Sequence, residues 1–291
     1  MRNFQKSLIF YILGLLIFLN VLAVIVAWDL AKAQFLEVNF FDVGQGDSIF
    51  IEDPQRHQIL IDGGPGSVVL EKLAKEMPFW DRTIDLVILT HPERDHISGL
   101  IEVLKRYKVE NVLWAGIIRD TAEFKEWEKA IKEEKSKIKI AQSGQRVTIP
   151  GVVQGKLYLE VLYPLENLAG EELKNSNNAS IVSRLIFGDV SFLFTGDVQK
   201  SAEKKLTEIE TNLNSDVLKI SHHGSKNSNS KEFIEKVSPK VAVISVGKGN
   251  SYGHPHQEVL DILEGCGIRV LRTDKDGDIK IISDGKNFKI R

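Results

Sequence analysis

The chain has 291 residues, enough for one large domain or two small ones. Hydrophobic residues make up 43% and charged residues 27%, shares that are ordinary for a globular protein. The formal net charge of −2 gives no overall basic excess, so strong non-specific binding to nucleic acid is not predicted from charge. The single cysteine, Cys266, rules out an intrachain disulfide and a thiolate-rich metal site, and we expect it to be a small core residue.

The amino terminus differs from the rest of the chain. An uncharged, mostly apolar run from Leu8 to Trp28 is long enough to cross a bilayer as a helix. Arg2 and Lys6 precede this run, which predicts that the start of the chain lies in the cytoplasm and the remainder outside it. We therefore predict a single-pass membrane anchor in residues 1–33 and an extracytoplasmic globular domain in residues 34–291.

The same segment has a second interpretation as a cleaved secretion signal. Ala31-Lys32-Ala33 resembles a signal-peptidase site, so cleavage after Ala33 would release a secreted protein. Under either interpretation the globular part is expected outside the cytoplasm.

Strands and helices alternate along the rest of the chain. Short apolar runs bounded by turn residues predict strands, and amphipathic segments predict helices. The predicted strands are 37–43, 48–52, 58–61, 84–89, 112–114, 156–163, 181–187, 191–194, 217–220, 241–246 and 268–272, followed by a hairpin of 278–282 and 287–290. The predicted helices are 68–76, 101–107, 121–135, 202–209, 231–237 and 257–263. This mixed order implies an α/β fold with two sheets and helices outside them.

The strongest functional signal is a cluster of ligand-type side chains at the end of a buried strand. The segment Thr90-His91-Pro92-Glu93-Arg94-Asp95-His96 follows the apolar run 84–89. It places four potential metal ligands within six residues, namely His91, Glu93, Asp95 and His96. Charged and imidazole groups placed together at a strand end need partners, and a divalent cation supplies them. The carboxylate of Glu93 suits zinc and also harder metals such as manganese.

Three further segments place a carboxylate or an imidazole just beyond an apolar run. They are Thr195-Gly196-Asp197, Ser221-His222-His223-Gly224-Ser225 and Gly253-His254-Pro255-His256. Because Asp197 is a single carboxylate in a turn that passes close to the site, we expect it to bridge two cations. Together with the first cluster, these segments predict a two-metal centre.

The histidines of the last two segments have alternative roles. In an extended segment the adjacent His222 and His223 point in opposite directions, so one of them would ligate a metal and the other would not. We favour His222 as the ligand, which leaves His223 for a substrate phosphate or a leaving group. Of His254 and His256, we favour His254 as a ligand and expect His256 to begin the following helix.

Several other polar residues are expected to support the ligands or to contact substrate. Asp62 ends an apolar strand and is predicted to accept a hydrogen bond from a ligand imidazole. Lys219 and Lys248 flank the last two motifs and, with Lys226, could draw in a polyanion. The remaining candidates for such supporting or substrate-binding roles are Asp47, Asn178, Ser225 and His256.

The order of these motifs resembles the metallo-β-lactamase superfamily and, within it, the extracytoplasmic hydrolase domain of ComEC-type DNA-uptake channel proteins. The similarity covers roughly residues 35–282. The segments that carry it are Phe41-Asp42-Val43-Gly44-Gln45-Gly46-Asp47-Ser48, Asp62-Gly63-Gly64, Thr90-His91-Pro92 with Asp95-His96, Thr195-Gly196-Asp197, His222-His223-Gly224-Ser225 and Tyr252-Gly253-His254-Pro255-His256. The resemblance implies an αββα sandwich.

Two departures from the family pattern affect the expected metal ligands. Glu93 stands where many members carry a histidine, and Asn177-Asn178-Ala179-Ser180 occupies a stretch where another ligand histidine is usual. The resemblance then implies two ligand sets that share Asp197, with partial occupancy expected in the first. The first set is His91, His222 and Asp197, with Glu93 as a further candidate, and the second is Asp95, His96, His254 and Asp197.

The resemblance implies metal-dependent hydrolysis of a phosphodiester, with DNA as the suggested substrate and zinc or manganese as the two ions. The cations would lower the pKa of a water molecule and neutralise phosphoryl charge, while Asp95 would steer the water and His223 would meet the substrate. One alternative is a phosphorylcholine esterase acting on cell-wall polymers. The other is an anchored binding module without turnover, for which Glu93 is the only support. No protein partner is predicted.

Overall fold

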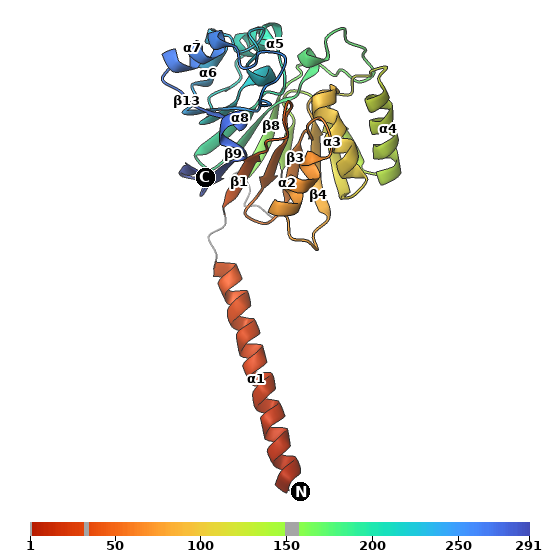
Figure 1. Ribbon diagram of the computed structural model, residues 1–291, viewed down its shortest axis with the longest axis vertical. Coiled ribbons are helices and arrows are strands. Elements are labelled where there is room, and N and C mark those ends of the chain that lie inside the picture. Colours follow the sequence, from red (N-terminus) through yellow and green to blue (C-terminus); the bar gives the residue numbers. More distant parts are fainter. Residues whose placement is uncertain (1, 32–34, 149–156) are drawn as a thin grey trace. The chain divides into compact units, whose positions relative to one another are not determined.

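The computed structural model describes residues 2–31, 35–148 and 157–291 (Figure 1). The chain divides into two compact units between Gln34 and Phe35. The first unit contains helix α1 (Arg2–Ala31), and the second contains the other helices and strands.

Helix α1 requires a correction to the predicted anchor. No helix in the described part of the chain is long and apolar enough to cross a membrane. The membrane-spanning helix that we predicted over Leu8–Trp28 is therefore not supported. The alternative cleavage after Ala33 falls outside the described residues.

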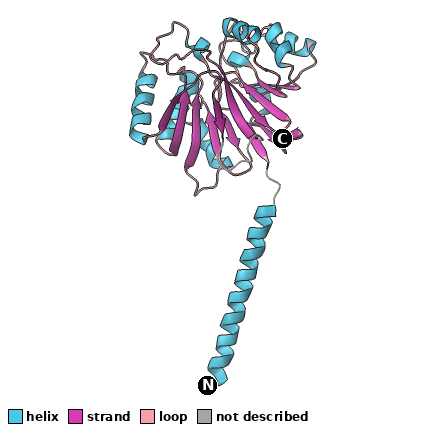
Figure 2. Ribbon diagram, turned by 180° about the vertical axis from the view of Figure 1, so that it is seen from behind, coloured by secondary structure: helices cyan, strands magenta, loops and turns pink. Residues whose placement is uncertain are grey.

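The strands of the second unit form two mixed sheets, seen at the centre of that unit in Figure 2. Their bounds are β1 (Leu36–Phe40), β2 (Ile49–Glu52), β3 (Gln58–Ile61), β4 (Thr83–Leu89), β5 (Lys108–Trp114), β6 (Lys137–Ile140), β7 (Arg146–Thr148), β8 (Leu157–Tyr163), β9 (Val182–Phe187), β10 (Val190–Phe194), β11 (Val217–Lys219), β12 (Val241–Ile244), β13 (Arg269–Arg272), β14 (Ile279–Ser283) and β15 (Phe288–Ile290). The first sheet has the order β15-β14-β1-β2-β3-β4-β5-β6, and the second has the order β13-β12-β11-β10-β9-β8-β7.

Helices cover the outer faces of both sheets. Their bounds are α2 (Val68–Glu76), α3 (Arg94–Leu104), α4 (Ala122–Glu134), α5 (Lys200–Glu208), α6 (Lys231–Val237), α7 (Gln257–Gly265) and α8 (Thr273–Asp276), with one-turn 3₁₀ segments η1 (Ser176–Ala179) and η2 (Ser221–Gly224). Figure 1 shows α2, α3 and α4 beside the strands of the first sheet and α5, α6 and α7 beside those of the second.

The core follows from the alternation of side chains along the strands. In β10, Phe192 and Phe194 pack between the two sheets, whereas the intervening Leu193 packs with residues of α5, α6 and α7 on the outer face. In β4, Ile88 likewise faces the inner core and Val87 packs toward α2, α3 and α4. This gives the helix–sheet–sheet–helix layers of the predicted αββα arrangement.

Most predicted elements are present, and the differences have local reasons. Helix α3 begins at Arg94 instead of residue 101, because Glu93 is its extended N-cap, so Asp95 and His96 lie in its first turn. Strand β6 was not predicted, since its lysine-rich sequence is largely exposed. The expected core residue Cys266 is instead an exposed residue that follows α7.

Candidate metal centre

Most of the predicted ligands meet at one edge of the sandwich, where successive parallel strands end. Strand β4 is parallel to β3, and β10, β11 and β12 are parallel to one another. His91 follows β4, Asp197 follows β10, and His222 and His223 follow β11. Because the carboxyl ends of parallel strands share one edge of a sheet, the fold collects residues far apart in the sequence at a single place.

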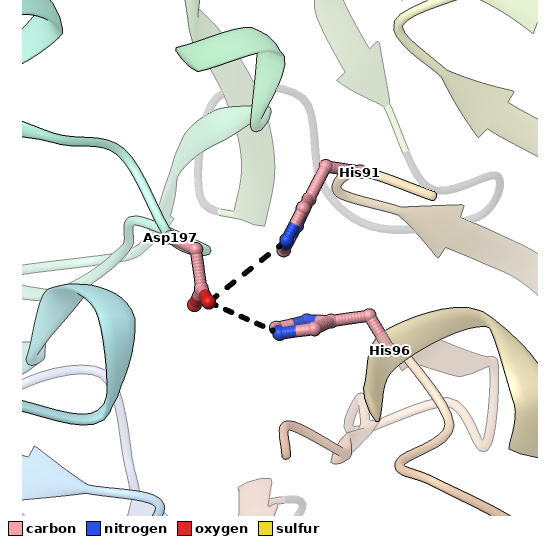
Figure 3. Close-up of side chains that lie close together, drawn as sticks. All are labelled: His91, His96 and Asp197. Atoms are coloured by element: carbon pink, nitrogen blue, oxygen red, sulfur yellow. Dashed lines mark ion pairs between the residues drawn. The ribbon is translucent and has the colours of Figure 1, made fainter. Parts of the chain in front are cut away.

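Asp197 is the centre of this group. Figure 3 shows the rings of His91 and His96 pointing at its carboxylate. The distances from Asp197 Oδ2 to imidazole Nε2 are 3.4 Å for His96, 3.5 Å for His223, 3.8 Å for His222 and 3.9 Å for His91. The structure thus places one buried carboxylate oxygen among four imidazoles from two separate parts of the chain.

Asp95 joins the same group from the first turn of α3. Its Oδ2 atom lies 3.3 Å from Nε2 of His223 and 4.0 Å from Nε2 of His96. The side chain of Asp95 is 32% exposed, whereas His96 is fully buried. Asp95 is therefore the carboxylate of this group that is open to a ligand from solvent.

Asp62 holds His96 in place. Its Oδ2 accepts hydrogen bonds from Nδ1 of His96 at 2.8 Å and from the hydroxyl of Thr90 at 2.6 Å, and its Oδ1 accepts the backbone N–H of Thr90 at 2.8 Å. With Nδ1 donating to Asp62, Nε2 of His96 is the nitrogen left to face Asp197. The expected hydrogen bond from an imidazole to Asp62 is present in the structure.

The prediction that His222 and His223 point in opposite directions is wrong. Both residues have left-handed backbone angles, with φ of 50° and 53°, so the segment is not extended and both rings turn toward Asp197. His223 is 1% exposed and its Nδ1 lies 2.8 Å from the carbonyl of Ser245, which leaves Nε2 toward the centre. His222 is more exposed, and its Nε2 lies 3.4 Å from the amide of Asn177.

The loop that carries the two histidines is fixed by Asn229. Its side-chain oxygen accepts the N–H of Ser221 at 2.9 Å, and its amide donates to the carbonyls of Ser221 at 2.9 Å and Ser225 at 3.3 Å. Glu203 of α5 in turn accepts the N–H of Asn229. These bonds compensate for the left-handed backbone at His222 and His223, which is costly for residues other than glycine.

Lys219 does not have the predicted role of attracting a polyanion. Its side chain is fully buried, and its Nζ forms an ion pair with Oδ2 of Asp47 and lies 3.8 Å from Oδ1 of Asp197. The ammonium also donates to the carbonyl of Gly196 at 3.3 Å. Asp47 itself is 1% exposed, so it cannot contact substrate directly and instead forms a buried charge pair with Lys219.

Glu93 lines the cavity over the cluster but is paired with residues outside it. Its Oε1 accepts a hydrogen bond from Arg119 at 3.0 Å and another from the hydroxyl of Ser176. Within the described residues, the groups of side chains whose ligand atoms lie within 4.8 Å of one another do not include it. Glu93 is therefore not placed as a ligand, because the Arg119 guanidinium already pairs with its carboxylate.

His254 lies at the rim of the centre. A cavity of about 170 Å³ opens over the cluster, and its lining combines cluster side chains with rim side chains. The lining residues are Gln45, Glu93, Asp95, Asn177, Asp197, His222, His223, Tyr252 and His254. The ring of His254 lies 5.6 Å from that of His222 and 6.3 Å from that of His223, and the ligand groups within the described residues do not include it. The structure thus brings His223 into the cluster where we expected His254.

The remaining predicted site residues lie outside the cavity lining. Asn178 accepts hydrogen bonds from Gln199 and Ser201, and it is the neighbouring Asn177 that faces His222. Ser225 is buried and caps its own loop, whereas Lys226 is exposed. His256 is the N-cap of α7, as expected, with its ring 5.0 Å from that of His254.

Sequence reasoning missed some residues that complete the centre. The hydroxyl of Ser180 accepts the backbone N–H of Asp197 at 3.0 Å. Gly196 lies so close to Ser180 and Thr90 that a Cβ at this position would come within 3.0 Å of both side chains. The Thr-Gly-Asp turn therefore needs its glycine for packing, which is the signal that pointed to a close approach here.

The imidazoles fall into two groups by the direction in which their pKa values are shifted. Burial opposes protonation, but the carboxylates of Asp197 and its neighbours raise the pKa of His96 well above its ordinary value and that of His223 to about 9. Burial and nearby imidazoles instead lower the pKa of His91 to about 3 and that of His254 to about 4. These shifts favour the protonated forms of His96 and His223 beside the carboxylates and the neutral forms of His91 and His254.

The donor atoms fit divalent cations. In the described part of the chain, Nε2 of His91, His96 and His223 and Oδ1 of Asp197 are buried without a hydrogen-bond partner. Buried polar atoms are rarely left unpaired, and their convergence on one point is typical of a metal centre. Imidazole nitrogen and carboxylate oxygen suit zinc and manganese, and no thiolate is present among these ligands.

The fold and the centre define a class of protein. A family model described as the metallo-beta-lactamase superfamily matches residues 41–248. The chain belongs to this superfamily of metal-dependent hydrolases, so the predicted resemblance is confirmed.

Two curated relatives make the similarity more specific. ComE operon protein 3 of Bacillus subtilis is 37% identical over 262 residues, which are 84% of this chain and 32% of that protein. Competence protein ComA of Neisseria gonorrhoeae is 32% identical over 247 residues, again 84% of this chain and 32% of that protein. The chain thus spans about a third of the length of either relative.

A solved structure supports the fold alone. Igni18, a metallo hydrolase from the archaeon Ignicoccus hospitalis, superposes with a TM-score of 0.56 at 16% sequence identity. The match covers 84% of this chain and 98% of that one.

Proposed function

We propose that the protein hydrolyses phosphodiester bonds of nucleic acid outside the cytoplasm, through two divalent cations. The observation that carries the proposal is the convergence of imidazole nitrogens on the Asp197 carboxylate, with Asp95 beside two of these nitrogens and both carboxylates lining an open cavity. The printed name of Competence protein ComA places that relative in competence, which favours DNA as the substrate class. The ComEC-type resemblance also favours a location outside the cytoplasm.

The ligands divide into two sets around Asp197. We assign Asp95, His96 and His223, whose ligand atoms lie close together, to the first set. We assign His91 and His222, which also face Asp197, to the second set. The second set has one carboxylate fewer, because Glu93 pairs with Arg119. Divalent cations held there lower the pKa of water and neutralise charge on phosphoryl oxygens. We assign zinc or manganese to these sets, with the second one the weaker.

Other residues of the chain position the reactants. Asp95 is a partly exposed carboxylate that lines the cavity, so it would orient an attacking water while it ligates. His254 at the rim takes the substrate-facing role that we first gave to His223, because His223 is buried. Its imidazole would hydrogen-bond the phosphate or the leaving oxygen.

The test is metal content together with turnover. The full chain would be purified without chelator and measured for bound metal and for hydrolysis of bis-p-nitrophenyl phosphate with Mn²⁺ or Zn²⁺. Asp197→Asn is compared with Asp189→Asn, an exposed aspartate in the hairpin turn at the opposite end of β10. We expect metal and turnover in the wild type and in Asp189→Asn, and loss of both in Asp197→Asn. A metal-free wild type that turns over no diester with either cation would refute the proposal.

Substrate panels separate the enzymatic alternatives. Release of product from p-nitrophenylphosphorylcholine without cleavage of DNA would favour an esterase acting on cell-wall polymers. Metal binding without turnover of either substrate would favour a binding module.

A further inference from the structure

Tyr252 presents an exposed aromatic ring at the rim of the candidate centre. Its side chain is 65% exposed and lines the same cavity as Asp95 and Asp197. One face of the ring stacks on His254, with centroids 5.7 Å apart and planes inclined by 21°. Exposed Phe79 and Trp80 precede the amino end of β4, whereas His91 follows its carboxyl end, so they do not share this position.

The ring is held on a fixed loop. The side-chain oxygen of Asn250 accepts the N–H groups of Tyr252 at 3.2 Å and His254 at 3.0 Å. The Asn250 amide donates to the carbonyls of His254 at 2.7 Å and Gly247 at 3.0 Å. The Asn250 side chain thus fixes the loop by hydrogen bonds to its backbone. The aromatic surface is therefore preorganised and loses little conformational freedom when a ligand binds.

The cavity is too small to enclose a nucleoside together with its phosphate. Its volume is about 170 Å³, whereas sites that bury a whole small molecule span about 300–1,000 Å³. A phosphodiester group can enter, but the base attached next to it must lie outside, over the rim. Tyr252 supplies the large apolar surface there, since the other rim side chains, among them Gln45, Glu93 and Asn177, are polar.

We propose that Tyr252 is a stacking platform for the base next to the cleaved phosphate, and that the preferred substrate is single-stranded nucleic acid. This proposal rests on the phosphodiesterase function proposed above. All four bases can stack on an aromatic ring, so stacking does not depend on the nucleotide sequence. In a single strand the face of the base is free to stack. Lys248, exposed on the same loop, is placed to contact the backbone of a strand that runs past the ring.

The experiment compares two labelled oligonucleotides of equal length and charge, one of thymidine and one with abasic tetrahydrofuran residues. Cleavage by the full chain with Mn²⁺ is measured as kcat/KM, and the readout is the ratio between the two substrates. We expect the wild type to prefer the base-bearing strand by about fivefold to a hundredfold. The ratio should fall to about one in Tyr252→Ala and persist in Tyr252→Phe and in the control Phe79→Ala.

Four outcomes would overturn all or part of the proposal. Equal cleavage of both oligonucleotides by the wild type, or an unchanged ratio in Tyr252→Ala, would show that the ring does not bind a base. Cleavage of a duplex as fast as the single strand would remove the single-strand preference. If neither oligonucleotide nor bis-p-nitrophenyl phosphate is hydrolysed, the phosphodiesterase function fails as well, which distinguishes that failure from the others.

Discussion

Replacing Lys219 with methionine should destabilise the protein severely. Methionine has a similar length and no charge, so it would leave the buried Asp47 carboxylate without its cationic partner and would remove the cation 3.8 Å from Asp197. Nδ1 of His223 lies 3.4 Å from Asp47 but already donates to Ser245, so it offers little compensation. Breaking a buried pair by removing one partner costs about 3–5 kcal/mol. In a domain of this size, that loss lowers Tm by roughly 6–20 °C.

The assay is denaturant unfolding of the full chain in the presence of a chelator, so that metal binding does not contribute to stability. Lys275→Met, at an exposed position, is the matched control and should change the free energy of unfolding by less than about 0.5 kcal/mol. The double variant Lys219→Met with Asp47→Asn removes both charges. It should recover about 2 kcal/mol relative to Lys219→Met alone, because the uncompensated carboxylate is gone.

Two results would refute the reasoning. A loss below about 1 kcal/mol in Lys219→Met would mean that Asp47 is solvated or protonated at little cost. A double variant no more stable than Lys219→Met would mean that the lysine stabilises the fold through packing of its methylene groups, independently of the Asp47 charge.

Three further predictions concern the metal ligands. Asp62→Asn should weaken metal affinity by about 10- to 100-fold, since His96 loses the carboxylate that orients it; competition with a chromogenic chelator measures this, and a change below threefold would contradict it. Glu93→Gln should leave the number of bound metals per chain unchanged in elemental analysis, because Glu93 pairs with Arg119; loss of one ion would show that it ligates. Metal affinity should rise with pH by about tenfold per unit for each proton released. His223, with its pKa raised to about 9, is protonated at pH 7 and must lose that proton to ligate, so the rise should extend from pH 7 to about 9. An affinity that does not change over that interval in calorimetric titrations would contradict the assignment.

The sequence was sufficient to predict the layers and the region of the site. Apolar runs followed by a threonine or serine and then by candidate ligands predicted β4, β10 and β11 close to their observed bounds. The order of strands along the chain then placed their carboxyl ends together. These features depend on local pattern and on the geometry of parallel strands, so a single sequence contains them.

The choice among neighbouring polar residues could not be predicted. His223 enters the cluster because two consecutive residues adopt left-handed backbone angles, which residue type alone does not indicate. The carboxylate of Glu93 pairs with Arg119, which lies 26 positions away, and not with the ligand cluster. Lys219 is buried and forms an ion pair with Asp47, which lies 172 positions away. Such pairings depend on which side chains the tertiary fold brings within reach, and periodicity along the chain contains no information about them.

The carboxylates of the centre explain why some candidate ligands are not expected to bind metal. Asp47 and Asp62 each belong to a group with metal-ligand spacing. Yet Asp47 is neutralised by Lys219, and Asp62 accepts hydrogen bonds from His96 and Thr90. Asp95 and Asp197 instead face the Nε2 atoms of the imidazoles, and the nearest lysine nitrogen to Asp197 lies 3.8 Å from its Oδ1. The protein therefore satisfies the two supporting carboxylates internally, and the other two, which line the cavity, are the ones we expect to bind divalent cations.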